Sequence, residues 1–387
     1  MLMVAAVLVA LTALPSAHAA SSGGKQLPPT TRAEIDEIVE QTMQQYNVPG
    51  FAVGVWRNGK QYVAEYGVAD LADDRPFVAT DHVRIASNTK TYTGTAVLQL
   101  VDQKKLALDD TLSEYVSGVP NGDQITVEQL LNMTAGTYDY TQDDAFNAEL
   151  TADPTMEFTT EDLMAILARH DAAFAPGTSW MYSDTNYAML GLIVEEVTGR
   201  PIGEVITEEI VDRLELRRTS YPTSTEVPNP RAVGYLWSPT PGSELRDVTP
   251  FNPDVAGAAG AMISTLPELE TWSREVADGT LLKPATQRAR LQFVDTGLSP
   301  NWDIGYGLGA MSWNGFVGHN GAIYGYNSAM FSLPKKDATI IVVSNASNNF
   351  EGMATDVFVQ VAEVVFPKQF PTSNTGATTT TAGRNGG

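Results

Sequence analysis

The chain has 387 residues, of which 43% are hydrophobic and 18% charged, so it is long enough to bury a sizeable core and is not a disordered chain. Asp and Glu number 46 against 24 Lys and Arg, and the resulting net charge of −22 disfavours binding to nucleic acid or to an anionic membrane. The lack of cysteine excludes disulfides, thiolate metal sites and a cysteine nucleophile, and a multi-histidine metal site would need nearly all of the four histidines. We therefore expect neither a metal nor a cofactor.

The first nineteen residues predict a signal peptide. They carry no charge, are apolar for most of their length and end in Ala17-His18-Ala19, which has the small-residue spacing of a signal-peptidase site. Pro15 interrupts the apolar run before it reaches the ~20 residues of a membrane span, and no cysteine follows to carry a lipid. We expect residues 1–19 to be removed and the mature chain to be secreted or periplasmic, in the cell-envelope space, without a membrane anchor. The alternative is a buried core helix.

Hydrophobic periodicity and turn signals predict the elements in chain order. Thr31–Tyr46 has helical spacing and stops at Pro49-Gly50, and Asn58-Gly59 between two apolar runs predicts a β-hairpin. Further helices are expected at Thr89–Lys105, Thr126–Asn132, Thr160–His170, Asn186–Thr198, Gly203–Leu214, Leu266–Ala277 and Gly352–Val365. Strands are expected at Tyr306–Trp313, Asn327–Ser332 and Ala338–Ser344, whereas residues 221–254, with seven prolines, predict an irregular excursion.

Strands at both ends of the chain with helices between them predict one sheet built from both ends. We expect residues 31–106 and 256–366 to form this sheet domain and residues 107–255 to form an inserted, mostly helical domain. Residues 371–387 are rich in Thr, Gly and Asn with almost nothing apolar to bury, which predicts a disordered tail.

The motif Ser87-Asn88-Thr89-Lys90 stands at the start of a predicted helix. A Ser and a Lys three residues apart on a helix share a face, so the amine can reach the hydroxyl, and the helix N-terminus favours negative charge on Oγ. A Lys that acts as a base must be neutral part of the time, which requires burial or positive potential. The alternative is a helix cap followed by a solvated lysine.

Two later motifs carry further polar groups. Tyr182-Ser183-Asp184 lies on the loop that enters the helix at Asn186, and a Tyr beside a Lys cation can have its pKa lowered until it exchanges protons near neutral pH. His319-Asn320-Gly321 ends a glycine-rich segment, and a glycine on an exposed strand edge lets a substrate backbone approach closely. The alternatives are an ordinary helix entry and an ordinary turn.

The order and spacing of these three motifs resemble the serine β-lactamase and penicillin-binding superfamily. The similarity covers roughly residues 33–366 and is greatest to the class C β-lactamase branch, with its soluble secreted D-alanyl-D-alanine carboxypeptidases and esterases. Other matching stretches are Leu130–Gly136, Tyr138–Thr141, Ala258–Thr265, Gly305–Gly309 and Gly318–Gly325. The family fold is α+β, an antiparallel sheet flanked by helices with a mostly helical domain, in agreement with the element order above.

The resemblance also implies catalytic roles. Ser87 is the nucleophile, Lys90 its activating partner and Tyr182 the proton shuttle to the leaving group, and His319 stands where the family has Lys or His. The second motif of the family usually ends in Asn, but here Asp184 stands in that place, and an ionised carboxylate cannot donate a hydrogen bond. Asp184 could instead hold Lys90 cationic and so shift the role of base to Tyr182. Asn186 could supply the missing amide.

Substrate contacts follow from the same resemblance. The oxyanion hole is expected from the backbone N–H groups of Ser87 and Ala322, the residue after Gly321. The soluble carboxypeptidases place an Arg shortly after Gly-Leu-Gly and Thr around the third-motif glycine, where they grip the terminal carboxylate of the substrate. This chain has Ala310-Met311 after Gly309, and Asn320 and Ala322 around Gly321, so that grip is missing.

The function implied is an exported serine acyl hydrolase that works through a covalent acyl-enzyme, of D-Ala-D-Ala carboxypeptidase type. Its substrate would be a small molecule or a peptide, namely a cell-wall peptide, an ester or a β-lactam. The missing Arg favours the alternative of an esterase, amidase or β-lactamase on the same fold. A catalytically lapsed penicillin-binding module is a third possibility.

Overall fold

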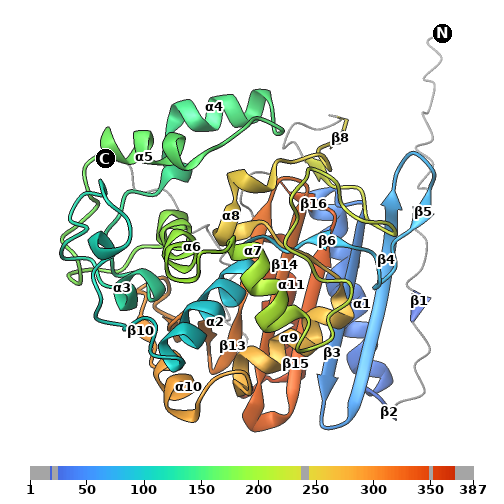
Figure 1. Ribbon diagram of the computed structural model, residues 1–387. Coiled ribbons are helices and arrows are strands. Elements are labelled where there is room, and N and C mark those ends of the chain that lie inside the picture. Colours follow the sequence, from blue (N-terminus) through green and yellow to red (C-terminus); the bar gives the residue numbers. More distant parts are fainter. Residues whose placement is uncertain (1–17, 20–24, 237–243, 348–351, 371–387) are drawn as a thin grey trace.

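The computed structural model describes residues 18–19, 25–236, 244–347 and 352–370 (Figure 1). The expected tail at residues 371–387 and all but the last two residues of the expected signal peptide lie outside the described residues. Within the described part of the chain, no helix combines the length and the hydropathy that a membrane crossing requires.

An eleven-stranded, largely antiparallel sheet forms the centre of the structure. Its order is β1-β4-β3-β15-β14-β13-β12-β11-β10, with β2 and β5 also paired to β4. The strands are β1 (His18–Ala19), β2 (Lys25–Gln26), β3 (Gly50–Arg57), β4 (Lys60–Asp70), β5 (Arg75–Pro76), β10 (Val294–Asp295), β11 (Ile304–Tyr306), β12 (Met311–Trp313), β13 (Phe316–Ile323), β14 (Tyr326–Leu333) and β15 (Ala338–Ser344). Pairing of β3 with β15, which sets Val55 opposite Ile340, joins the two ends of the chain in one sheet.

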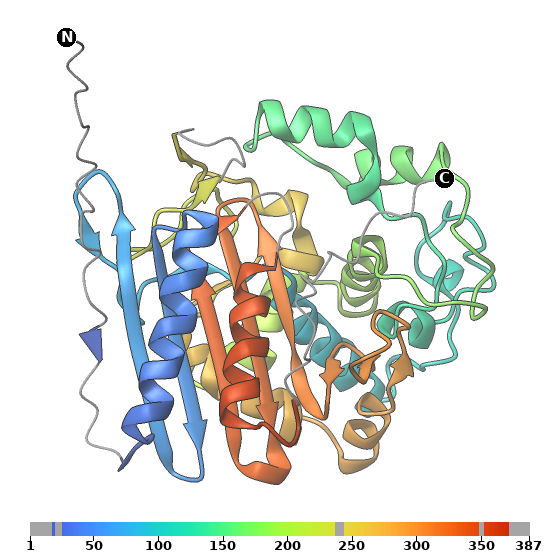
Figure 2. The same ribbon diagram turned by 180° about the vertical axis from the view of Figure 1, so that it is seen from behind.

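Helices cover both faces of this sheet. On one face, α1 (Pro29–Tyr46) packs beside α11 (Met353–Val365), as Figure 2 shows. On the other face, α9 (Leu266–Asp278) packs against β13, β14 and β15. The helical spacing of apolar residues gives each of these helices one apolar face, and that face packs on the sheet. In α1, for example, this face buries Ile35 and Val39.

The remaining helices gather mainly to one side of the sheet (Figure 1). They are α2 (Thr89–Asp102), α3 (Val127–Leu131), α4 (Asp144–Ala152), α5 (Thr160–Ala168), α6 (Asp184–Thr198), α7 (Ile202–Ile206), α8 (Gly257–Gly260) and α10 (Pro284–Arg290). Short turns and strands complete the fold: η1 (Ala86–Asn88), η2 (Leu112–Glu114), η3 (Tyr140–Gln142), η4 (Thr207–Val211), η5 (Pro253–Val255), η6 (Pro334–Lys336), β6 (Val83–Arg84), β7 (Tyr235–Leu236), β8 (Arg246–Asp247), β9 (Ile263–Ser264) and β16 (Ala346–Ser347). The predicted α+β class is confirmed, whereas the domain boundaries at 106 and 255 remain predictions.

Several elements differ from the expectation, and three of them lie close to the motifs. The predicted strand Tyr306–Trp313 is wrong, because Gly307 donates to the carbonyl of Ala310 (2.8 Å) and turns the chain, so that β11 and β12 form a hairpin. Strand β13 was not among the expected strands, because glycines interrupt its apolar pattern. Helix α4 was not expected; its short apolar pattern is stabilised by Asp143, whose carboxylate accepts the N–H of Phe146 (2.8 Å) as an N-cap.

Candidate active site

Ser87 lies in η1, where the chain turns from β6 into α2. Ala86 before it has a left-handed φ of 51°, a strained conformation for a residue with a side chain and one that is typical of functional turns. The turn is tied to the sheet because Asn88 donates to the carbonyl of Ile85 (3.1 Å) and to the hydroxyl of Ser328 on β14 (2.7 Å). Ser87 is thereby presented, half-buried, at the N-terminus of α2.

The side chain of Lys90, in the first turn of α2 and three residues after Ser87, is fully buried. Its Nζ donates to Ser87 Oγ (3.1 Å) and to the carbonyl of Ala259 (2.8 Å), and it forms an ion pair with the carboxylate of Asp184. These three contacts match the three N–H donors of an ammonium group. The resting site therefore holds Lys90 as a cation, which must lose a proton before it can accept the proton of Ser87.

Tyr182 lies close to this pair, with its ring centroid 4.9 Å from Lys90 Nζ. Its hydroxyl is buried and has no hydrogen-bond partner of normal geometry in the described part of the chain. Burial, and then the negative charge of Asp184, raise the pKa of Tyr182 well above its ordinary value. The expectation that Lys90 lowers this pKa is therefore wrong for the resting site: Asp184 compensates the lysine charge, and Tyr182 is a neutral phenol.

His319 lies on β13 with a completely buried ring. Its Nδ1 is 2.6 Å from the carbonyl of Asn320, which can only accept, so Nδ1 carries the proton and Nε2 accepts from the hydroxyl of Tyr306 (3.0 Å). Burial and then the charge of Lys90 lower the pKa of His319 to about 3. The ring is therefore neutral at physiological pH and supports Tyr306 and, 6.1 Å away between centroids, Tyr182.

The three predicted substrate-binding side chains Asp184, Asn186 and Asn320 are placed differently. Asp184 is the first residue of α6 and lines the pocket beside Ser87. Asn186 is buried and accepts a hydrogen bond from Thr137 Oγ1 (2.6 Å), so it does not line the pocket. Asn320 donates to Thr355 of α11 (3.0 Å), away from the pocket, because neighbouring residues of a strand point to opposite faces.

The edge of β13 passes next to Ser87. Strand β12 pairs with β13 only as far as Gly318, and beyond that residue β13 pairs with β14 alone. A Cβ atom at Gly321 would lie 2.5 Å from the carbonyl oxygen of Ile85 and 2.9 Å from the backbone N of Ser87. The absence of a side chain there lets β13 approach η1 and brings Ala322 to the same pocket as Ser87.

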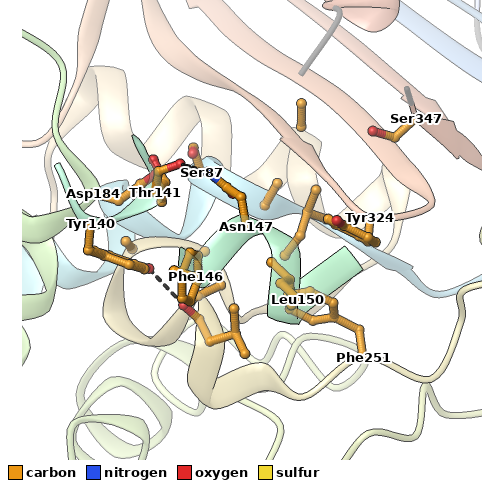
Figure 3. A pocket seen from close by; sticks show the side chains of 17 residues that line it. Ser87, Tyr140, Thr141, Phe146, Asn147, Leu150, Asp184, Phe251, Tyr324 and Ser347 are labelled. Carbon is orange, nitrogen blue, oxygen red and sulfur yellow. Dashed lines mark hydrogen bonds between the residues drawn. The ribbon is translucent and has the colours of Figure 1, made fainter. Parts of the chain in front are cut away.

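A pocket of about 580 Å³ opens beside Ser87 (Figure 3). Ser87 and Asp184 lie at one end of it, and the apolar side chains of Leu150, Phe251 and Tyr324 extend toward the other. The full lining is Ala86, Ser87, Tyr140, Thr141, Phe146, Asn147, Leu150, Asp184, Phe251, Val255, Ala256, Ala259, Gly260, Ala322, Ile323, Tyr324 and Ser347. Among the residues that the structure describes, Asp184 is the one charged side chain in this lining, and none of the lining residues is a cation.

Most of the apolar wall was not predicted from the sequence. Phe146 and Leu150 come from α4, Phe251 from the proline-rich excursion, and Tyr324 from the turn after β13. These segments meet through tertiary contacts, such as the 3.2 Å hydrogen bond between the hydroxyls of Thr151 on α4 and Tyr324. No local sequence signal marks such a wall.

Comparison with known proteins gives a family match over most of the chain. The sequence profile of the beta-lactamase family matches residues 35–362. Protein flp of Staphylococcus aureus (strain N315) is 29% identical over 336 residues, which cover 83% of this chain and 64% of that protein. The putative penicillin-binding protein PbpX of Bacillus subtilis (strain 168) is 29% identical over 270 residues, or 68% of this chain and 62% of PbpX. The chain thus spans less than two thirds of these relatives.

Two solved structures are similar along nearly their whole length. A D-stereospecific amidohydrolase from Streptomyces sp. shares 31% of its residues, with a TM-score of 0.77 and coverage of 86% of this chain and 98% of that one. The D-amino acid amidase of Ochrobactrum anthropi SV3, complexed with L-phenylalanine amide, is 22% identical, with a TM-score of 0.75 and coverage of 88% and 99%. At 22% identity, the similarity to the Ochrobactrum amidase shows that this chain has the same fold.

Proposed function

The chain belongs to the beta-lactamase family of serine hydrolases, and from this premise we propose that it hydrolyses amides or esters of D-amino acids with bulky apolar side chains. The reaction proceeds through an acyl-enzyme on Ser87. The D configuration is supported by the similarity to the Streptomyces D-stereospecific amidohydrolase. The substrate is a small molecule or a short peptide.

The observation that carries this proposal is the character of the pocket beside Ser87. Its wall of Phe146, Leu150 and Phe251 is apolar and suits a large apolar side chain. Its one charged lining group among the described residues, Asp184, is 20% exposed and pairs with Lys90 through Oδ1, and its second carboxylate oxygen can accept a hydrogen bond from a substrate amine. An amino acid amide or ester with an apolar side chain satisfies both conditions.

The acylation step follows from the contacts of Ser87. Lys90, once it has lost a proton, accepts the proton of the Ser87 hydroxyl while Oγ attacks the substrate carbonyl carbon. The oxyanion that forms accepts hydrogen bonds from the N–H groups of Ser87 and Ala322, and one such donor is worth roughly 2.7–4 kcal/mol in the transition state. The resting contact of 3.1 Å between Lys90 and Ser87 argues against a lapsed site.

Tyr182 completes the proton path. As a neutral phenol beside Lys90, it donates a proton to the leaving amine or alcohol and is reprotonated from Lys90. Water then attacks the carbonyl carbon of the acyl-enzyme while neutral Lys90 takes its proton, and this proton passes to Ser87 Oγ as the bond between Oγ and the acyl carbon breaks. His319 accepts a hydrogen bond from Tyr306 and so holds the Tyr306 ring against the edge of Tyr182.

The test compares wild type and Ser87→Ala on the amides of D- and L-phenylalanine, a D-Ala-D-Ala peptide and a fluorescent penicillin. We expect the D-phenylalanine amide to be the best substrate. Ser87→Ala should lower kcat by at least about a thousandfold, with a Tm within about 2 °C of wild type, because no buried apolar group is removed. A Ser87→Ala protein that keeps more than about a tenth of the turnover would contradict the assignment of the nucleophile.

A D-Ala-D-Ala carboxypeptidase is the second candidate, and the similarity to a putative penicillin-binding protein favours it. No cation among the described lining residues is available to bind the terminal carboxylate, and Met311, after the Gly-Leu-Gly segment, is buried outside the pocket. A charge-assisted hydrogen bond contributes roughly 1.5–3 kcal/mol, so a true carboxypeptidase should prefer the free acid to its amide by at least about tenfold. Equal kcat/KM values for the two would favour the amidase.

Export is a separate proposal that rests on the sequence of residues 1–19. Expression of the full chain in a secreting bacterial host should release a protein whose N-terminus lies near Ala20, as N-terminal sequencing can determine. Recovery of the uncut chain from the cytosol alone would contradict it.

A further inference from the structure

A second buried carboxyl group lies behind the Lys90–Asp184 pair. Asp139 is 5% exposed, and its Oδ1 accepts the backbone N–H groups of Asp184 (3.3 Å) and Thr141 (3.3 Å). It is also the N-cap of η3, which contributes Tyr140 and Thr141 to the pocket. The steps described above do not use it.

The groups that face Asp139 come from three elements. Asp184 of α6 and Lys90 of α2 are the charged ones, and Tyr140 and Tyr182 are phenols whose pKa values its negative charge helps to raise. Two carboxyl groups thus lie near one ammonium group, and Asp184 is the one that contacts it. If all three were ionised, the buried cluster would carry an excess negative charge, which is costly without a partner.

The contacts decide which carboxyl group keeps a proton. Asp184 is paired directly with Lys90, whereas Asp139 accepts hydrogen bonds from the backbone of Asp184 and from the backbone and side chain of Thr141, and it forms no ion pair within the described ranges. Burial, and then the charge of Asp184, raise the pKa of Asp139 to about 7. Asp139 is therefore the group that gains and loses a proton in the neutral range.

We propose that Asp139 is a positioning residue whose carboxyl group is protonated in the active site at rest and which, on ionising, strengthens the hold of Asp184 and its surroundings on the Lys90 ammonium. A more strongly held ammonium is slower to yield the proton that Lys90 must lose before it can accept the proton of Ser87. This inference rests on the proposed function, because it takes Lys90 to be the base of the reaction.

Asp139→Asn tests this directly. Asn reproduces the protonated carboxyl group in shape, and its oxygen can still accept the N–H groups of Asp184 and Thr141, but it cannot ionise. Below about pH 6 the variant and wild type should therefore coincide, and above neutrality the variant should be faster because Lys90 no longer faces a second negative charge.

The measurement is kcat and KM for one reporter ester from about pH 5 to about pH 10. The kcat of Asp139→Asn should reach half its maximum at a pH at least about half a unit lower than that of wild type. On the ascending limb this shift makes the kcat of the variant about threefold higher than that of wild type at the same pH, and KM should change little. A purely structural role would lower kcat by one factor at every pH, and that result would overturn the proposal.

Asp143→Asn is the matched control. Asp143 is a similarly buried cap carboxylate, but it pairs with Arg169 and His170 and not with the Lys90 cluster. Its substitution should leave the midpoint of the profile in place. If Asp143→Asn shifts the midpoint as far as Asp139→Asn does, the effect does not belong to Asp139.

If the variant fails to fold, a measurement on the wild-type protein can still test the proposal. Carboxyl ¹³C NMR of aspartate-labelled protein should show one aspartate that titrates in the neutral range, and its absence would overturn the proposal. If hydrolysis of the reporter ester does not require Ser87, the proposed function itself is wrong. An unchanged Asp139→Asn profile in an enzyme that needs Ser87 contradicts this inference alone.

Discussion

Lys90 has three hydrogen-bond acceptors, and their identity determines what the site can do at rest. One is the Ser87 hydroxyl, one the carbonyl of Ala259 and one the carboxylate of Asp184. The carboxylate stabilises the charged form of Lys90, which is the form that cannot act as a base. The replacement of the usual Asn of the family by Asp184 is therefore the residue-level feature with the largest consequence for the chemistry.

Asp184→Asn should shift the activity of this enzyme to lower pH. The amide keeps the size of the side chain and can still accept from Lys90, but it no longer supplies the negative charge that holds the ammonium. We expect the ascending limb of the pH–rate profile to move further than in Asp139→Asn, since Asp184 contacts Lys90 directly. Profiles of kcat/KM that overlay those of wild type would place Asp184 outside the proton network.

The sequence predicts a contact in this site where the spacing of two residues along one helix determines it. It does not predict a contact that depends on which face of a sheet a side chain points to. Ser87 and Lys90 are one helical turn apart, so their contact follows from the motif alone. The direction of the Asn320 side chain depends on the register of β13, and a shift of one residue reverses it. The pKa of Tyr182 depends on the burial of its hydroxyl, which no local pattern reports.

Among the elements, the approach of β13 to η1 positions the oxyanion donors. Gly321→Ala should lower kcat by at least about a hundredfold, because the new Cβ would lie within 2.5 Å of the Ile85 carbonyl oxygen and push β13 away from Ser87. Ala322→Gly is the control, since it retains the backbone N–H and adds no atom. Steady-state kinetics and Tm of both variants test this. A Gly321→Ala enzyme as active as Ala322→Gly would show that the approach is not needed.

Helix α4 forms one wall of the pocket and should determine the size of the acyl group. Leu150→Phe adds bulk at a buried wall position and should lower kcat/KM for the D-phenylalanine amide by at least about tenfold, while the D-alanine amide is little affected. Leu150→Met conserves volume and should leave the ratio of the two substrates unchanged. If Leu150→Phe lowers both substrates equally, the apolar side chain does not occupy this pocket.

The elements that the sequence predicts best are those with a strong internal pattern. Ala338–Ser344 is a continuous run of apolar and β-branched residues and forms β15 with the predicted bounds. Helix α4 has nine residues and depends for its placement on the contacts of Asp143 with Arg169 and His170, which are 26 and 27 residues away. Its existence is therefore set by tertiary structure.

At the scale of the whole molecule, both ends of the chain and the inserted helices converge on one site. Ser87 follows the N-terminal strands, Asp184 comes from the helical segment, and Ala322 comes from the C-terminal strands. The site therefore exists only when the long-range pairing of β3 with β15 has formed. Global stability and the ionisation of buried groups in the site are consequently linked, and pH should act on both.

Asp139 and Asp143 should affect global stability in opposite senses. Burial raises the pKa of Asp139 above that of an unfolded Asp, so its contribution to stability is complete below about pH 4 and is lost as pH rises to about 7. The ion pair and hydrogen bonds to Arg169 hold the pKa of Asp143 well below its ordinary value, so its contribution is present above about pH 4 and is lost as pH falls below that.

Urea unfolding from about pH 3 to about pH 8 separates the two contributions. Between about pH 4 and pH 7, wild type should lose stability relative to Asp139→Asn by up to about 1.4 kcal/mol per pH unit, the limit for one proton. The difference between wild type and Asp143→Asn should instead be largest near neutral pH and close below about pH 4. A gap between wild type and Asp139→Asn that stays constant across this range would mean that Asp139 binds the same number of protons in the folded and unfolded states. Asp139 would then ionise near pH 4 in the folded protein, and the buried cluster around Lys90 would carry its excess negative charge at neutral pH.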